Sequence, residues 1–64
     1  IQFNGSDRIV PEDTTIQQLL DAAQIPVRFC AVECNLEIVP KADYARQVVR
    51  EGDRIEVVTL VGGG

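Results

Sequence analysis

The sequence predicts an α+β domain of the β-grasp type, in which one mixed sheet wraps across a single main helix. Three observations lead to this fold class. A hairpin signal, Asn4-Gly5, lies between two short apolar runs, and both turn positions tolerate a positive φ. An apolar stripe with helical spacing follows directly, and two later segments have the composition of strands. Because the apolar face of a hairpin needs cover, we expect the sheet to pack on that helix.

Residues 11–24 are expected to hold the main helix. Thr14 and Gln17 have the spacing of a capping box at its N-terminus. Four apolar residues recur at positions i, i+3, i+4 and i+7 and would form one buried stripe: Ile16, Leu19, Leu20 and Ala23. Pro26 is expected to stop the helix.

Two strands and a turn are expected next. Residues 27–35 are rich in Val, Phe and Cys and predict a strand, followed by a turn near Asn35-Leu36 and a short strand from residue 37. Residues 41–53 predict a short helical turn that ends at Gly52 as its C-terminal cap. Its inward residues would be Tyr44, Val48 and Val49.

The last predicted strand covers residues 54–61. Its alternation places Ile55 and Val57 on one face, with Glu56, Val58 and Leu60 on the other. The expected domain organisation is a single domain over residues 1–64, with a folded body over 1–61 and a flexible glycine tail over 62–64.

Composition and charge exclude several classes of protein. The chain has 64 residues, of which 45% are hydrophobic and 25% charged, as in an ordinary globular domain. Its net charge of -4 argues against a nucleic-acid partner, which would call for a basic patch. No apolar run approaches the roughly 20 residues that span a bilayer, so we expect no membrane association and a cytoplasmic location. Without histidine, a phosphate-binding loop or clustered ligands, the sequence predicts no catalytic residues, no metal site and no enzyme.

Cys30 and Cys34 are expected to be buried packing residues. Four residues along a strand cover about 13 Å, whereas a disulfide needs Cα atoms within about 7 Å. Both thiols would point to one face together with Val32. The alternative is a redox pair, although the C-x-x-C spacing of such sites is missing.

The chain ends in Gly62, Gly63 and Gly64. Extended, three glycines reach about 10 Å. Without Cβ atoms they could thread a slot that accepts only backbone, and the terminal carboxylate is ionised at neutral pH. Such a carboxylate can attack the α-phosphate of ATP to give a mixed anhydride, which is open to a sulfur or nitrogen nucleophile. A frayed terminus is the alternative.

The chain resembles the ThiS family, the small ubiquitin-like sulfur carriers of thiamin biosynthesis. The resemblance covers essentially the whole length. It is carried by the N-x-x-I-V-P stretch (residues 35–40), Tyr44, the Gly52-Asp53 turn and the terminal glycines. Lys41 departs from the family, which more often has Arg after the proline.

The resemblance implies a mechanism and its partners. A ThiF-like adenylyltransferase would adenylylate the Gly64 carboxylate and consume ATP, so the chain itself needs no cofactor. Sulfur from a cysteine-desulfurase-derived persulfide would then give a C-terminal thiocarboxylate, which a ThiG-like thiazole synthase would use. Gly62 and Gly63 would thread the partner's slot, and Val58, Leu60 and Val61 would form an apolar docking face.

Three other functions stay open at this point. The small subunit of molybdopterin synthase, a MoaD-like sulfur carrier, has the same fold and the same Gly-Gly end. A ubiquitin-like modifier would join its tail to a lysine. A small redox protein would use Cys30 and Cys34 instead of the tail.

Overall fold

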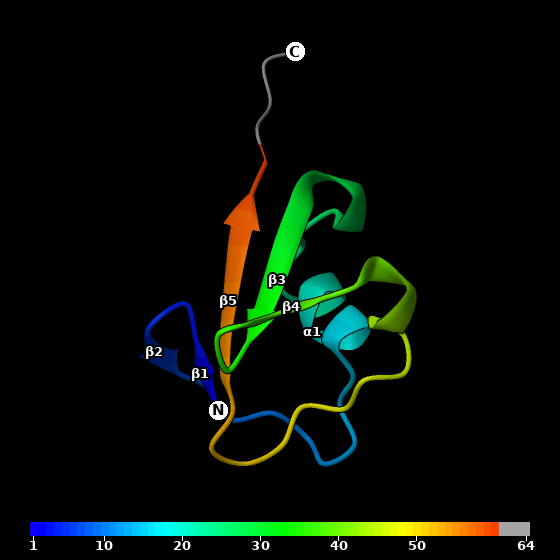
Figure 1. The fold of residues 1–64 in the computed structure, drawn as a ribbon. Coiled ribbons are helices and arrows are strands. Elements are labelled where there is room, and N and C mark those ends of the chain that lie inside the picture. The colour runs from blue at the N-terminus through cyan, green and yellow to red at the C-terminus, as the bar shows by residue number, and fades with distance from the viewer. Residues whose placement is uncertain (61–64) are drawn as a thin grey trace.

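Residues 1–60 form a five-stranded mixed sheet with one α-helix on one of its faces (Figure 1). The computed structural model describes residues 1–60. The elements are β1 (Gln2–Phe3), β2 (Ser6–Asp7), α1 (Ile16–Ala22), the 3₁₀ turn η1 (Val27–Phe29), β3 (Cys30–Cys34), β4 (Glu37–Val39), the 3₁₀ turn η2 (Lys41–Asp43) and β5 (Arg54–Thr59). The predicted β-grasp arrangement is confirmed.

The strand order is β2-β1-β5-β3-β4, so the last strand of the chain lies in the middle of the sheet. β5 runs parallel to β1 and antiparallel to β3. The predicted hairpin at Asn4-Gly5 is confirmed, with φ of 50° and 83° at the two turn residues. Asn4 also extends the pairing with β5, because its side-chain oxygen accepts a hydrogen bond from the Val57 N–H at 2.7 Å.

The core lies between α1 and the inner face of the sheet, the face that α1 covers. Its buried residues are Phe3, Ile16, Leu19, Leu20, Cys30, Val32, Val39, Tyr44, Val49 and Ile55. The helical stripe is confirmed for Ile16, Leu19 and Leu20, whereas Ala23 is half-buried at the C-cap of α1. This core includes the predicted inward residues Tyr44 and Val49, while Val48 is half-buried.

The predicted capping box is wrong by one residue. Thr15, not Thr14, caps α1: its hydroxyl accepts from the Gln18 N–H, and the Gln18 side chain accepts from the Thr15 N–H. Thr14 is buried and donates instead to the Pro11 carbonyl at 2.6 Å. Two adjacent threonines each precede a glutamine by three residues, so spacing alone could not choose between them.

Two further boundaries differ from the prediction. Residues 27–29 form a 3₁₀ turn rather than the start of β3, because the Phe29 N–H bonds back to the Pro26 carbonyl at 3.1 Å. Within residues 41–53 only η2 is helical; Val48 pairs with Thr15 in an isolated antiparallel bridge. Gly52 therefore caps no helix, but adopts φ 87° in the turn before β5, a conformation that favours glycine.

Candidate functional site

The C-terminal end of β5 is fixed in place by its neighbour β3. The register pairs Cys30 with Thr59, and the Leu60 N–H donates to the Phe29 carbonyl at 2.6 Å, one residue beyond the end of β5. Because the pairing continues to Leu60, the point from which the chain enters residues 61–64 is held by the sheet. The predictions for Val61, Gly62, Gly63 and Gly64 lie outside the described residues.

Exposed apolar side chains surround this end of the sheet. Val58 is 56% exposed, Leu60 50% and Phe29 48%, whereas Ile55 and Val57 of the same strand face the core. The predicted alternation along β5 is thus confirmed. The docking role of Val58 and Leu60 stays a prediction. Phe29 is an exposed apolar neighbour of Leu60 that the alternation along β5 could not reveal.

Both cysteines are free thiols that pack against the core. Cys30 is fully buried and Cys34 half-buried, on the same face of β3 as Val32. Burial raises the pKa of both thiols; the Asp53 carboxylate raises the pKa of Cys34 further, and Lys41 partly offsets the increase at Cys30. A redox cysteine needs a lowered pKa to form its thiolate, so this environment argues against the redox alternative.

Two polar residues of the ThiS-like motifs turn out to join distant turns. The Asn35 side-chain oxygen accepts from the Arg54 N–H at 2.9 Å, and its amide donates to the Asp53 carboxylate at 3.0 Å. The other oxygen of Asp53 accepts from the Arg50 N–H at 2.8 Å. Asn35 and Asp53 therefore clamp the β3–β4 turn onto the start of β5, a structural role that the sequence analysis missed. A local signal existed, since Asn and Asp commonly satisfy turn backbone.

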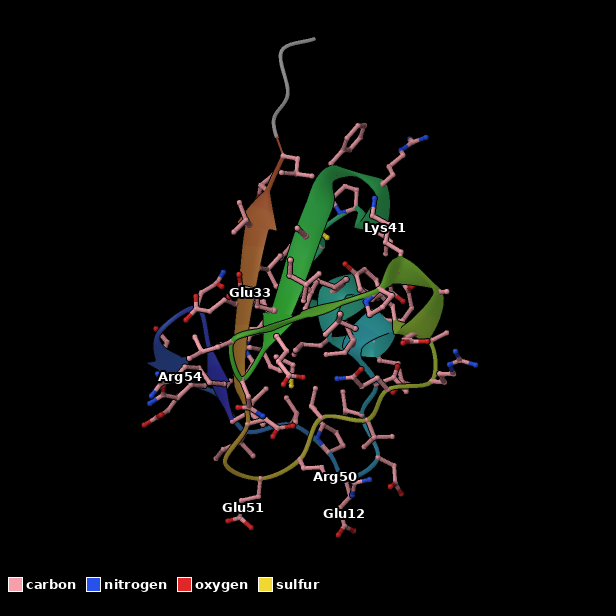
Figure 2. The ribbon with its side chains drawn as sticks, viewed as in Figure 1. Glu12, Glu33, Lys41, Arg50, Glu51 and Arg54 are labelled. Atoms are coloured by element: carbon pink, nitrogen blue, oxygen red, sulfur yellow. The ribbon has the colours of Figure 1, made fainter. Side chains whose placement is uncertain are left out.

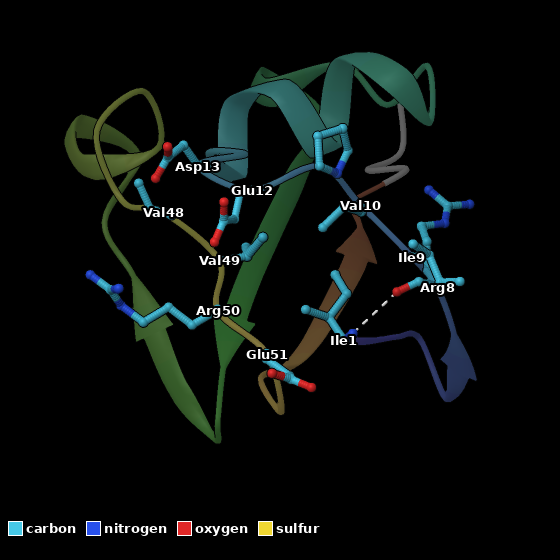
Figure 3. A pocket seen from close by; sticks show the side chains of 11 residues that line it. Ile1, Arg8, Ile9, Val10, Glu12, Asp13, Val48, Val49, Arg50 and Glu51 are labelled. Carbon is cyan, nitrogen blue, oxygen red and sulfur yellow. Dashed lines mark hydrogen bonds between the residues drawn. The ribbon is translucent and has the colours of Figure 1, made fainter.

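Residues 1–60 present a surface groove of about 450 Å³ far from the end of β5 (Figure 3). It lies between the loop before α1 and the segment before β5, and its charged lining residues are Arg8, Glu12, Asp13, Arg50 and Glu51. Figure 2 shows Glu12, Arg50 and Glu51 at the opposite end of the molecule from Lys41. The groove mixes both charge signs and contains no cysteine or histidine, so it offers no nucleophile of those kinds.

The described part of the chain holds no cluster of three His, Cys, Asp or Glu side chains suited to a metal ion. Within the same range no helix has the length and apolar character needed to cross a membrane.

The fold, with its central last strand and exposed apolar end, defines a ubiquitin-like β-grasp domain. Comparison with known proteins supports this class. The model of the ThiS family matches residues 1–64. A crystal structure of the thiamine biosynthesis protein ThiS from Geobacter metallireducens superposes with a TM-score of 0.83 at 27% identity, covering 98% of this chain and 96% of that one.

Two curated relatives give the same family. The sulfur carrier protein ThiS of Bacillus subtilis is 42% identical over 65 residues, which cover all of this chain and 98% of the relative. A thiazole synthase of Paramagnetospirillum magneticum is 44% identical over 62 residues, which cover 97% of this chain but only 19% of that longer protein. The chain belongs to the ThiS family, the sulfur carrier proteins of thiamin biosynthesis. The members of that family are small sulfur carrier proteins rather than catalysts.

Proposed function

We propose that the Gly64 carboxylate of this chain is the group that carries sulfur. A ThiF-like adenylyltransferase activates it, and a ThiG-like thiazole synthase receives the sulfur in the cytoplasm. The main observation in support is the match to the ThiS family over the full length of the chain, which includes the terminal glycines. The sheet adds support, because it holds Leu60 in place immediately before the residues that must enter a partner's active site.

The chemistry requires only a carboxylate at the end of a narrow stalk. A carboxylate oxygen attacks the α-phosphorus of ATP, and the bond to the leaving pyrophosphate breaks. The terminal sulfur of a persulfide, supplied by a cysteine desulfurase, then attacks the acyl carbon and displaces AMP. A thiol cleaves the resulting S–S bond and releases the thiocarboxylate.

The proposed thiazole synthase partner has a specific observation behind it. One relative named thiazole synthase contains a segment similar to nearly the whole of this chain within a protein about five times as long. In that relative, a carrier-like segment is therefore part of the same polypeptide as the remainder of the enzyme.

Intact-mass measurement tests the proposal. The chain is incubated with ATP, the adenylyltransferase and a persulfide source, and its mass should rise by one oxygen-to-sulfur exchange. An unchanged mass with an enzyme active on another carrier would contradict the proposal. Attachment of a whole protein would favour the modifier function instead.

Gly63→Val is the matched variant. The branched side chain blocks a slot that accepts only backbone and restricts the allowed φ/ψ values. Pyrophosphate release should fall steeply at an unchanged melting temperature, since the substituted residue follows the last strand. Normal release would show that the glycines are not threaded.

A further inference from the structure

The end of β5 is held in place from one side only. On the β1 side the paired register stops at Ile55, and the Asn4 side chain adds one further bond, to the Val57 N–H. Within residues 1–60, the backbone beyond Val57 is hydrogen-bonded only on the β3 side, where the Leu60 N–H donates to the Phe29 carbonyl at 2.6 Å. The position of Leu60 is therefore set by η1, the 3₁₀ turn to which Phe29 belongs.

The three carbonyl groups of η1 accept hydrogen bonds from three different parts of the chain. The Val27 carbonyl accepts from the Cys30 N–H, and the Cys30 thiol donates to it at 3.5 Å. The Phe29 carbonyl accepts from the first N–H after β5. Between them, the Arg28 carbonyl accepts from the Lys41 ammonium at 3.5 Å, across thirteen residues. The last carbonyls of a helical turn have no partner within the turn, and a lysine side chain can satisfy them.

The contact of Lys41 with η1 depends on charge more than on a short bond. A distance of 3.5 Å is long for a hydrogen bond, but the donor carries a full charge and faces a carbonyl dipole. Burial raises the pKa of the Cys30 thiol, and the Lys41 ammonium partly offsets that rise, so its charge acts beside η1. Figure 2 shows Lys41, the first residue of η2, next to the η1 ribbon. The side chain therefore ties η2 to η1.

We propose that Lys41 is a positioning residue for activation of the C-terminus. Its ammonium holds the Arg28 carbonyl and so restrains η1, and the next carbonyl of η1 holds Leu60, the residue before those that enter the partner's active site. A segment whose starting point is already ordered loses less conformational freedom on binding, so a loosened η1 weakens binding to the activating enzyme. The inference rests on the proposed function and deepens it by assigning a role to a residue outside the tail.

Lys41→Met tests this role, because methionine keeps an unbranched side chain but has no charge and no donor. Hydrogen exchange of the Leu60 amide in the free carrier, followed by NMR, should become about threefold to tenfold faster, while exchange in the buried strands stays the same. The KM for the carrier, measured by pyrophosphate release, should rise about threefold with kcat unchanged, because the cost of ordering falls on binding. The melting temperature should change little, since Lys41 is exposed.

A conservative variant and a matched control accompany the test. Lys41→Arg restores the charge and supplies more donors, so it should return both KM and the Leu60 exchange rate to within about twofold of the wild-type values. Arg46→Met removes one cation from the segment just after η2, but Arg46 pairs with Asp43 rather than with η1. This control should leave both the Leu60 exchange rate and KM unchanged.

Three results for Lys41→Met would overturn the positioning role. A raised KM with unchanged exchange at Leu60 would make Lys41 a direct contact with the enzyme. Faster exchange throughout the buried strands would make it a residue that stabilises the whole fold, and an unchanged KM would show that activation does not depend on η1. If an active enzyme does not adenylylate the wild-type chain, the proposed function fails instead, whereas the exchange comparison still reports on Lys41, so the two failures are distinguishable.

Discussion

The two faces of the sheet carry similar side chains with opposite surroundings, and β5 shows this most directly. Ile55 is fully buried against α1, whereas Val58, three residues later, is 56% exposed on the outer face. Within residues 1–60, α1 covers only the inner face (Figure 1). The inner face therefore supplies most of the stability of the fold, while the outer face leaves apolar surface free for another protein. Substitutions on the two faces should consequently separate folding from partner recognition.

The largest expected effect comes from shortening one residue on each face of β5. Ile55→Ala removes buried methyl groups and leaves a cavity, so it should lower the free energy of unfolding by about 2–5 kcal/mol. Val58→Ala should change it by no more than about 0.5 kcal/mol, because the side chain is already half in water. Urea unfolding of both variants measures the difference. Equal losses would contradict the division between the faces.

An intermediate effect is expected at the clamp between the turns. Asp53→Ala removes the acceptor for both the Asn35 amide and the Arg50 N–H. The free energy of unfolding should fall by about 1–3 kcal/mol, since a partly buried charged acceptor is lost. Asp7→Ala makes the same charge change at a carboxylate that accepts no hydrogen bond from residues 1–60, and it serves as the control in thermal unfolding. A loss no greater than that of the control would mean that the clamp adds no stability.

The smallest effect on stability is expected from the ionisable side chains on the inner face of the sheet. It is negligible at neutral pH and grows as the pH rises. Burial raises the pKa of Cys30 and Cys34 above 9.0 and that of Tyr44 above 10.0. Below pH 9 the thiols are neutral in both the folded and unfolded states, so their contribution to stability is fully present. Above it, the unfolded chain loses protons first, and stability falls as the pH rises through the raised pKa values.

Melting temperatures between pH 7.5 and pH 10.5 check this dependence, with pH values chosen to bracket 9.0 and 10.0. The double variant Cys30→Ala, Cys34→Ala should be less stable at pH 7.5 but should lose less on going to high pH. A wild-type melting temperature that is flat across the range would show that the two thiols and Tyr44 ionise as easily in the folded chain as in the unfolded one.

The sequence by itself determined the features that depend on neighbours along the chain. Asn4-Gly5 specifies its turn because both residues accept a positive φ, and the helical spacing of Ile16, Leu19 and Leu20 identifies the buried side of α1. The two-residue alternation in β5 likewise separates Ile55 from Val58. The ThiS resemblance extended this local information to the fold and the family, both of which the comparisons support.

Tertiary structure decided what depends on residues far apart in the chain. Thr15 rather than Thr14 caps α1, because two hydrogen bonds hold Thr14 in a buried position. Its hydroxyl donates to the Pro11 carbonyl, and its own carbonyl accepts from the Val49 N–H. The clamp joins Asn35 to Asp53 across a gap of eighteen residues. Glu33 and Glu56 meet only when β3 pairs with β5. Spacing along the sequence cannot specify such contacts, because they form only when the hydrophobic core brings separate strands into one register.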